Sequence, residues 1–171
     1  MADQYLVDLA AEPVAKSSTF ALWVLTHDQI HDLLASSGYS WTKAASSKRE
    51  VKEGTFHPTA RARTAIPVPI RRFLEKFDGR EEQGRVLYHG CGKDGHGLGA
   101  LTRNGRDDVV GYDPYHPDVE FRKPPRGKFD EVFSIYTLNV VERGVGVGIL
   151  AEIASLLKKG GRAVIAVRRD L

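Results

Sequence analysis

The sequence has very little cysteine and no long apolar segment. Cys91 is the only cysteine among 171 residues, so neither an internal disulfide nor a zinc site built from cysteines can form. No apolar run approaches the roughly 20 residues that cross a bilayer. The N-terminus, "MADQYLVDLAAEP", carries acidic residues where a secretory signal carries basic ones. We therefore expect a cytoplasmic protein that does not contact a membrane.

Basic residues are concentrated in one part of the chain, although the net charge is only +3. Residues 43 to 72 contain eight lysines and arginines but only two acidic residues, Glu50 and Glu53. Such a segment can bind phosphates, and its candidates for contact with a DNA or RNA substrate are Arg61, Arg63 and Arg71. A solvated loop and helix face would account for the same charges equally well.

The second half of the chain alternates short apolar runs with helical patterns. Runs at 85–89, 108–112, 129–136 and 161–167 are typical of buried strands. The clearest helix between them covers 147–158, with two lysines in its last turn and a glycine pair after it. Because parallel strands need crossover connections, this alternation predicts an α/β fold, a Rossmann-like parallel sheet with flanking helices.

The first half of the chain is less regular. Apolar positions predict a helix over 69–77, and Thr26 with Gln29 forms a capping-box pattern for a helix from residue 27 to about 35. The run 19–25 before it fits either a strand or an extension of that helix. We interpret residues 1–65 as an N-terminal extension of a helix plus a basic loop, and residues 66–171 as the Rossmann-like domain.

A glycine-rich turn follows the first strand of this domain. In "VLYHGCGKDGHGLG", residues 86 to 99, Gly90, Gly92 and Gly95 satisfy G-x-G-x-x-G, and Asp113 ends the next strand. Glycines let a backbone approach a ligand closely, and a carboxylate at that strand end can accept hydrogen bonds from a ribose. The pattern predicts an adenosine-type cofactor, either a dinucleotide or S-adenosylmethionine; a purely structural turn is the alternative.

Longer strings resemble a known superfamily. "VLYHGCG", "VVGYDPY", "FDEVFSIYTLNVVE" and "LLKKGGRAVIAV" resemble successive motifs of class I S-adenosylmethionine-dependent methyltransferases over about residues 83–170. More narrowly, "ARTAIPVPIRRFLE", "YHGCG", "YDPYHPD" and "LNVVE" look like methyltransferases associated with DNA phosphorothioation systems. The resemblance implies S-adenosylmethionine as cofactor, a role in DNA modification, and cofactor contacts at the positions that match its motifs, namely His89, Gly90, Cys91, Gly92, Gly95, Asp113 and Pro114.

Two departures from the superfamily pattern concern the glycine turn and the sheet edge. Tyr88 stands where the first strand usually ends in an acidic residue that helps to hold the methionine end of the cofactor, so Asp94 is a candidate to replace that residue. The fold is also truncated after the fifth strand, at "VRRDL". A sheet edge would then need to be covered by the N-terminal segment, by a partner subunit or by a second copy in a homo-oligomer.

Candidate catalytic residues follow the strand 129–136. Tyr136 and Asn139 lie where substrate contacts are expected, and Glu142 or His89 could accept a proton. Each of Tyr136 and Asn139 could instead only cap or pack the loop. The histidines show no metal-ligand spacing, and no metal site is expected.

We therefore expect an S-adenosylmethionine-dependent methyltransferase. One alternative is a catalytically inactive protein of the same fold that binds the cofactor or a partner for regulation. Another is an NAD-dependent oxidoreductase, which the glycine spacing also allows.

Overall fold

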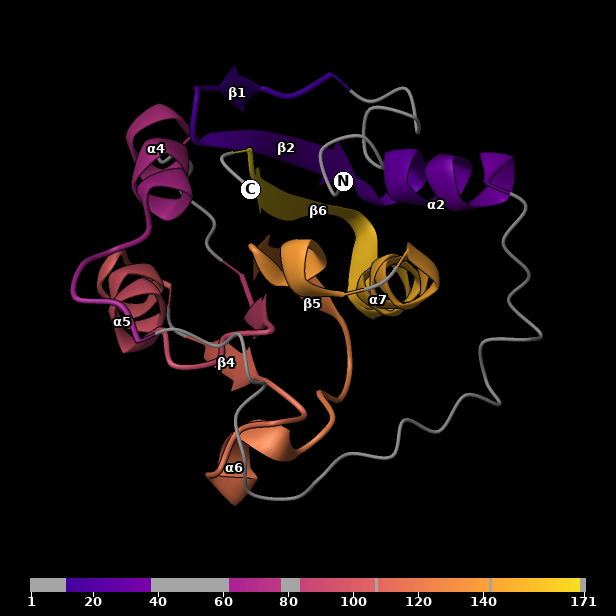
Figure 1. Ribbon diagram of the computed structural model, residues 1–171. Coiled ribbons are helices and arrows are strands. Elements are labelled where there is room, and N and C mark those ends of the chain that lie inside the picture. Colours follow the sequence, from indigo (N-terminus) through magenta and orange to yellow (C-terminus); the bar gives the residue numbers. More distant parts are fainter. Residues whose placement is uncertain (1–11, 38–61, 78–83, 107, 142, 170–171) are drawn as a thin grey trace.

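A six-stranded mixed sheet forms the centre of the computed structural model, which describes residues 12–37, 62–77, 84–106, 108–141 and 143–169. The strand order is β1-β2-β6-β5-β3-β4 (Figure 1). The last four strands in this order are mutually parallel, whereas β1 and β2 are antiparallel additions at one edge. The strands are β1 (Ala15–Lys16), β2 (Phe20–Thr26), β3 (Val86–His89), β4 (Val109–Tyr112), β5 (Phe129–Ile135) and β6 (Leu157–Arg168).

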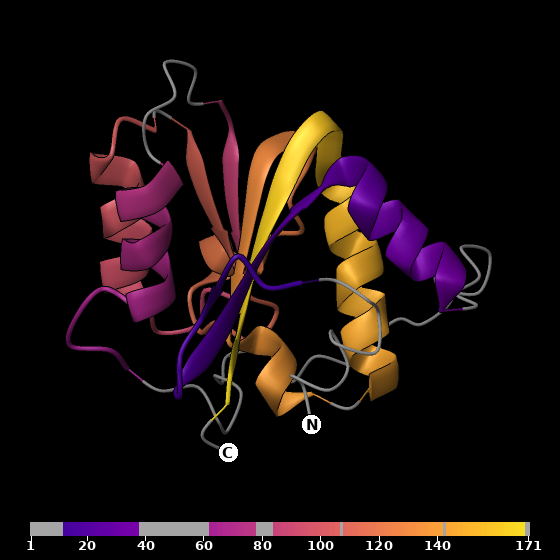
Figure 2. The same ribbon diagram turned by 90° about the horizontal axis from the view of Figure 1, so that it is seen from above.

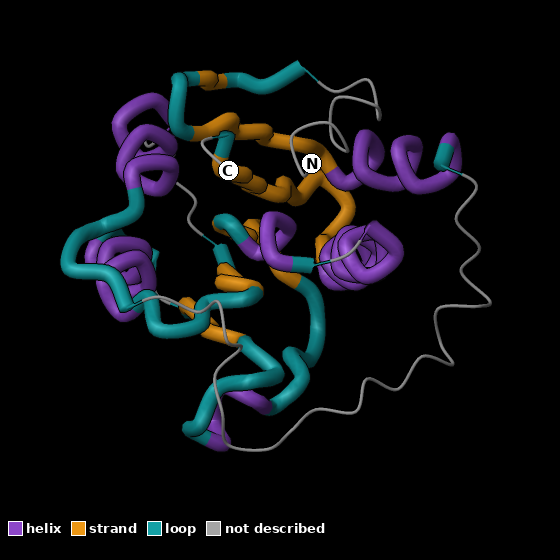
Figure 3. The backbone as a smooth tube through the Cα atoms, viewed as in Figure 1, coloured by secondary structure: helices purple, strands orange, loops and turns teal. Residues whose placement is uncertain are grey.

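Helices cover both faces of this sheet. In the two views of Figures 1 and 2, α2 and α7 lie on one face, and α4 and α5 lie on the other. Figure 3 shows the strands in a row between these helix pairs. The predicted α/β class is therefore confirmed, and the arrangement is consistent with a Rossmann-like fold. The helical segments are α2 (His27–Ser36), α4 (Val68–Phe77), α5 (Gly95–Arg103), α6 (Val119–Arg122), the 3-10 turn η1 (Thr137–Val140) and α7 (Arg143–Leu156).

The four strands predicted in the second half are all present, but the boundary between α7 and β6 differs from the expected one. The helix ends at Leu156, and the two lysines and the glycine pair belong to the start of β6. Gly160 adopts a left-handed conformation (φ +84°), and the pairing of β5 with β6 shifts register here. Lys158 Nζ bonds to Asp130 Oδ2 on β5 at 2.8 Å. This bulge, and not a helix end, is what the glycines serve.

The exposed edge expected beside the last strand is covered by the N-terminal segment of the same chain. β2 pairs with β6 along its whole length, from Phe20 opposite Arg168 to Thr26 opposite Arg162. Residues 19–25, which fitted either a strand or a helix, therefore contribute a strand. Part of the segment interpreted as an N-terminal extension belongs to the sheet itself.

Alternation along β2 supplies both layers of the core. Ala21, Trp23 and Leu25 pack toward α2 and α7, whereas Phe20 and Leu22 pack toward α4 and α5. A strand with both faces buried is favoured by this near-continuous apolar run.

The helix α2 begins at the expected capping box. The backbone N–H of Gln29 donates to Thr26 Oγ1 at 3.2 Å, and the backbone N–H of Thr26 donates to Gln29 Oε1 at 2.9 Å. From this start, Ile30 and Leu34 pack into the core on the α7 side. The helix predicted over 69–77 is α4, which buries Ile70 and Phe73 on the opposite side.

Candidate functional site

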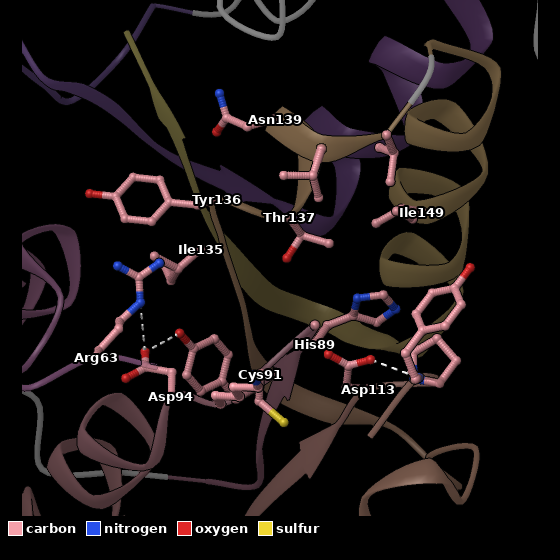
Figure 4. A pocket seen from close by; sticks show the side chains of 18 of the residues that line it. Arg63, His89, Cys91, Asp94, Asp113, Ile135, Tyr136, Thr137, Asn139 and Ile149 are labelled. Atoms are coloured by element: carbon pink, nitrogen blue, oxygen red, sulfur yellow. Dashed lines mark hydrogen bonds and ion pairs between the residues drawn. The ribbon is translucent and has the colours of Figure 1, made fainter. Parts of the chain in front are cut away.

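A cavity of about 380 Å³ lies at the carboxyl ends of β3, β4 and β5 (Figure 4). β3 lies between β4 and β5 in the sheet, so the chain leaves β3 toward one side and later returns to its other side. Ligands of open α/β sheets bind in the crevice outside the strand ends at such a switch point. The volume lies within the range of about 300–1,000 Å³ that small-molecule sites occupy.

The floor of the cavity is the glycine turn after β3. Gly90 and Gly92 both have positive φ angles, +71° and +49°, which other residues adopt at a cost. The Tyr112 carbonyl at the end of β4 accepts hydrogen bonds from the N–H of Gly90 at 2.7 Å and of Cys91 at 3.2 Å. A Cβ atom on Gly90 would lie only 2.4 Å from Thr137 Oγ1. The turn therefore requires glycine and sits directly against the loop after β5.

The third glycine of the motif has less structural need than its neighbour Gly97. A Cβ atom on Gly95 would meet nothing within 4 Å, whereas one on Gly97 would lie 2.3 Å from Asp94 Oδ2 and 2.9 Å from Ile70 Cδ1. Close packing of α5 thus depends on Gly97, which the G-x-G-x-x-G spacing did not single out.

Asp94 is a buried carboxylate that lines the cavity and caps α5. Its Oδ1 accepts a hydrogen bond from the Gly97 N–H at 2.9 Å, which satisfies an open donor at the helix N-terminus. Its Oδ2 accepts the Tyr88 hydroxyl at 2.6 Å. Burial, and then the Asp94 charge, raise the pKa of Tyr88 well above its ordinary value, so the hydroxyl stays protonated as a donor. Tyr88 therefore orients an acidic group instead of supplying one.

Arg63 approaches the same end of the cavity from upstream of α4. Its Nε lies 3.8 Å from Asp94 Oδ2, and its guanidinium carbon lies 4.8 Å from the centroid of the Tyr136 ring. Tyr136 is held in the left-handed region, φ +64°, directly before η1. Figure 4 shows Arg63 between Asp94 and Tyr136. An opposite-charge pair and an aromatic ring thus come together at one end of the site.

Asp113 lies at the end of β4 with a buried side chain. Its Oδ1 accepts the Tyr115 N–H at 2.8 Å in a turn that also includes Pro114. A carboxylate has about four acceptor positions, so this bond leaves capacity for a ligand hydroxyl. The two carboxylates, Asp94 and Asp113, therefore flank the glycine turn from opposite sides (Figure 4).

Cys91 is buried in the glycine turn and is not placed as a reactive thiol. Burial, and then the charge of Asp113, raise the pKa of the Cys91 thiol to about 12. The thiol therefore stays protonated at neutral pH, and a thiolate is the form that reacts. The backbone of Cys91, not its sulfur, contributes to the turn.

The side chain of Asn139 connects the loop after β5 to the backbone of β6. Its Nδ2 donates to the Arg168 carbonyl at 3.1 Å, and its Oδ1 accepts the Arg168 N–H at 2.8 Å. Both atoms of the side-chain amide are engaged with the backbone of β6. The alternative in which Asn139 fastens the loop after β5 is the one that this geometry favours.

His89 is the last residue of β3 and lies on the α7 side of the cavity. Its Nε2 is 2.9 Å from Glu152 Oε2 on α7, and its ring lies edge-on to Tyr112 with the centroids 5.4 Å apart. The imidazole is 2% exposed, and within the described part of the chain its Nδ1 has no hydrogen-bond partner. The buried Thr137 Oγ1 likewise lacks a partner. Two residues of the lining thus carry buried polar atoms that lack a partner among the described residues.

The structure describes two of the three basic residues expected to contact nucleic acid, Arg63 and Arg71. Arg61 lies outside the described residues, as does Glu142. Arg71 is exposed on α4, whereas Arg63 lines the cavity. Arg63 therefore belongs to the same site as the glycine turn.

Sequence reasoning missed Glu152, Thr137 and the position of Arg63. Glu152 is an ordinary polar residue in a helical pattern, and its pairing with His89 spans 63 positions. Arg63 stands among several other basic residues, so nothing local distinguishes it. Asp94, by contrast, was a candidate from the sequence, because the resemblance places an acidic residue near this turn and Tyr88 does not supply it.

Comparisons with protein-family models, with curated proteins and with solved structures find no match to this chain. None of the helices in the described ranges has the length and apolar character that a bilayer crossing requires.

Proposed function

We propose that this protein is an S-adenosylmethionine-dependent methyltransferase that binds its cofactor in the cavity at the ends of β3, β4 and β5. The observation that carries the proposal is the Asp113 carboxylate beside the left-handed turn at Gly90 and Gly92, at the switch point of the sheet. The turn allows close approach of a ligand to the backbone, and Asp113 can accept hydrogen bonds from ribose hydroxyls.

The order of the strands supports the proposal. The strings that resemble methyltransferase motifs fall on β3, β4, β5 with η1, and β6. These strands lie in the order β4-β3-β5-β6, which is the 2-1-4-5 portion of the Rossmann order 3-2-1-4-5-6. In the described part of the chain, β2 follows β6 as an antiparallel strand, so an N-terminal segment of the chain pairs with this edge.

The charged end of the cavity fits the amino-acid part of this cofactor. That part carries a carboxylate and an ammonium group, and Arg63 and Asp94 offer the complementary charges 3.8 Å apart. The Asp94 carboxylate takes the place of the acidic residue that Tyr88 replaces, and the Tyr88 hydroxyl orients it. When bound, the cofactor supplies a methyl group already activated on a sulfonium. The protein's task is then to hold and orient the acceptor.

Calorimetry with S-adenosylhomocysteine, S-adenosylmethionine and NAD tests the proposal. We expect binding of at least one of the first two, and Asp113→Ala should weaken it about tenfold or more, because hydrogen bonds to a charged group contribute roughly 1.5–3 kcal/mol. Asp108→Ala is the matched control, since Asp108 is exposed at the other end of β4 and pairs with Arg85.

Tight NAD binding without binding of either sulfur compound would overturn the proposal in favour of an oxidoreductase. Transfer of a tritiated methyl group from S-adenosylmethionine to DNA, RNA or protein extracts then distinguishes a methyltransferase from an inactive protein that only binds the cofactor.

A further inference from the structure

His89 lines the cavity, and behind the lining it is paired with Glu152 of α7. The carboxylate of Glu152 accepts from, or pairs with, Nε2 of the imidazole at 2.9 Å. With Nε2 held as the N–H, the neutral ring carries its lone pair on Nδ1. A carboxylate that fixes one nitrogen of a histidine so that the other can accept a proton is a recurring arrangement in catalysis.

The His89 side chain is buried, so the orientation of its ring decides which nitrogen lacks a partner within the described ranges. His89 is 2% exposed, and a buried polar atom without a partner destabilises the folded state. The nearby Thr137 hydroxyl, which lies against Gly90, carries a second such atom. Figure 4 shows the His89 ring between Thr137 and Asp113, with Ile149 beside it. Besides the Glu152 carboxylate, titratable groups of the described residues beside the ring include Tyr112 of β4, whose ring is edge-on to it, and Asp113, directly after β4 (Figure 4).

We infer that His89 Nδ1, oriented by Glu152, is the proton acceptor for methyl transfer, so that the acceptor atom belongs to an O–H or N–H group. The acceptor's lone pair forms the new bond to the methyl carbon, and the electron pair of the broken carbon–sulfur bond remains on sulfur. The acceptor's proton passes to Nδ1 of His89. A thioether or a ring nitrogen without a proton would need no such base. This inference rests on the proposed function.

The first test measures the tautomer of the His89 imidazole and does not depend on a methyl-transfer assay. Long-range proton–nitrogen NMR of protein labelled with ¹⁵N-histidine, recorded at pH 8, should show His89 with its proton on Nε2. Glu152→Gln should change this tautomer signal, whereas Glu75→Gln, an exposed carboxylate on α4, should not. A proton found on Nδ1 in the unchanged protein would overturn the inference.

The second test separates transfer from cofactor binding. His89→Gln should lower the rate of tritium-methyl transfer at saturating cofactor by roughly 100-fold or more, as loss of a general base does, while calorimetry still detects binding of S-adenosylhomocysteine. Imidazole added to His89→Ala should restore part of the rate, which a packing defect would not permit. His27→Gln, on α2, is the histidine control.

Each outcome separates the inference from the function on which it rests. If His89→Gln transfers methyl groups at an unchanged rate, the inference that His89 is the proton acceptor is wrong, and the proposed methyltransferase function still stands. Cofactor binding by the unchanged protein without transfer to DNA, RNA or protein overturns the catalytic role of His89. Failure of both sulfur compounds to bind overturns the proposed function itself.

Discussion

At the scale of single residues, one buried carboxylate, that of Asp94, connects several parts of the site. The buried hydroxyl of Tyr88 donates to Asp94 at 2.6 Å. Asp94 in turn caps α5 and lies beside Arg63. One carboxylate thereby serves the helix, the tyrosine and the charged end of the cavity.

If the proposed function holds, Arg63 recognises the amino-acid end of S-adenosylmethionine. Arg63→Met should weaken S-adenosylhomocysteine about tenfold, because a charge-assisted bond to the carboxylate is lost. Binding of 5′-deoxy-5′-methylthioadenosine, which lacks that end, should change by less than about threefold. Calorimetry with both ligands checks this, and Arg72→Met, exposed on α4 and paired with Glu75, is the control. Equal losses for the two ligands would contradict the assignment.

At the scale of elements, β2 determines whether the sheet is complete. It is antiparallel to β6 and fills both core layers from one strand. Without it, β6 would present a row of unpaired backbone groups, which favours association with other chains. The loop after β5 also ends on β6, because Asn139 is bonded to Arg168. The edge strand and the site are thus joined through β6.

Trp23 is the side chain of β2 on which the α2 and α7 layer depends most. It is fully buried, so Trp23→Ala should lower the free energy of unfolding by about 3–5 kcal/mol. Lys16→Ala, an exposed position on β1, should change it by less than about 0.5 kcal/mol. Urea denaturation followed by circular dichroism measures both values. A loss below about 1 kcal/mol for Trp23→Ala would mean that β2 contributes little to the folded state.

At the scale of the whole molecule, the cavity joins segments from most of the described chain. Arg63 comes from before the first parallel strand, and Arg168 comes from the end of the last one; both line the cavity with the loops after β3, β4 and β5. A ligand in this position contacts parts that are otherwise held together only through the sheet. Its binding should therefore stabilise the fold as a unit.

Thermal unfolding should report this stabilisation. S-adenosylhomocysteine at one hundred times its Kd adds about 2.7 kcal/mol, which corresponds to a rise in Tm of roughly 5–10 °C for a domain of this size. NAD at the same concentration should leave Tm unchanged. Scanning calorimetry gives both values, and a rise with NAD alone would point to the oxidoreductase alternative.

The sequence alone determined the elements whose patterns are local. Apolar runs bounded by glycines identified β3, β4, β5 and β6, and Thr26 with Gln29 identified the start of α2, because caps and periodicity involve neighbouring residues. The sequence also predicted the glycine turn, since only glycine adopts the backbone angles of Gly90 and Gly92 without strain. The end of α7 was misplaced because a glycine pair serves a helix end or a strand bulge equally well.

The tertiary structure decided which distant residues meet. The strand β2 is part of the sheet because it pairs with the edge of β6, which is far from it along the sequence. Likewise, Arg63 reached Asp94, and His89 reached Glu152, through the packing of separate helices against the sheet. Charge and polarity are visible in a sequence, but complementary partners far apart along the chain leave no local pattern. The fold brings such partners together because the helices bury their apolar faces against the two sides of the sheet.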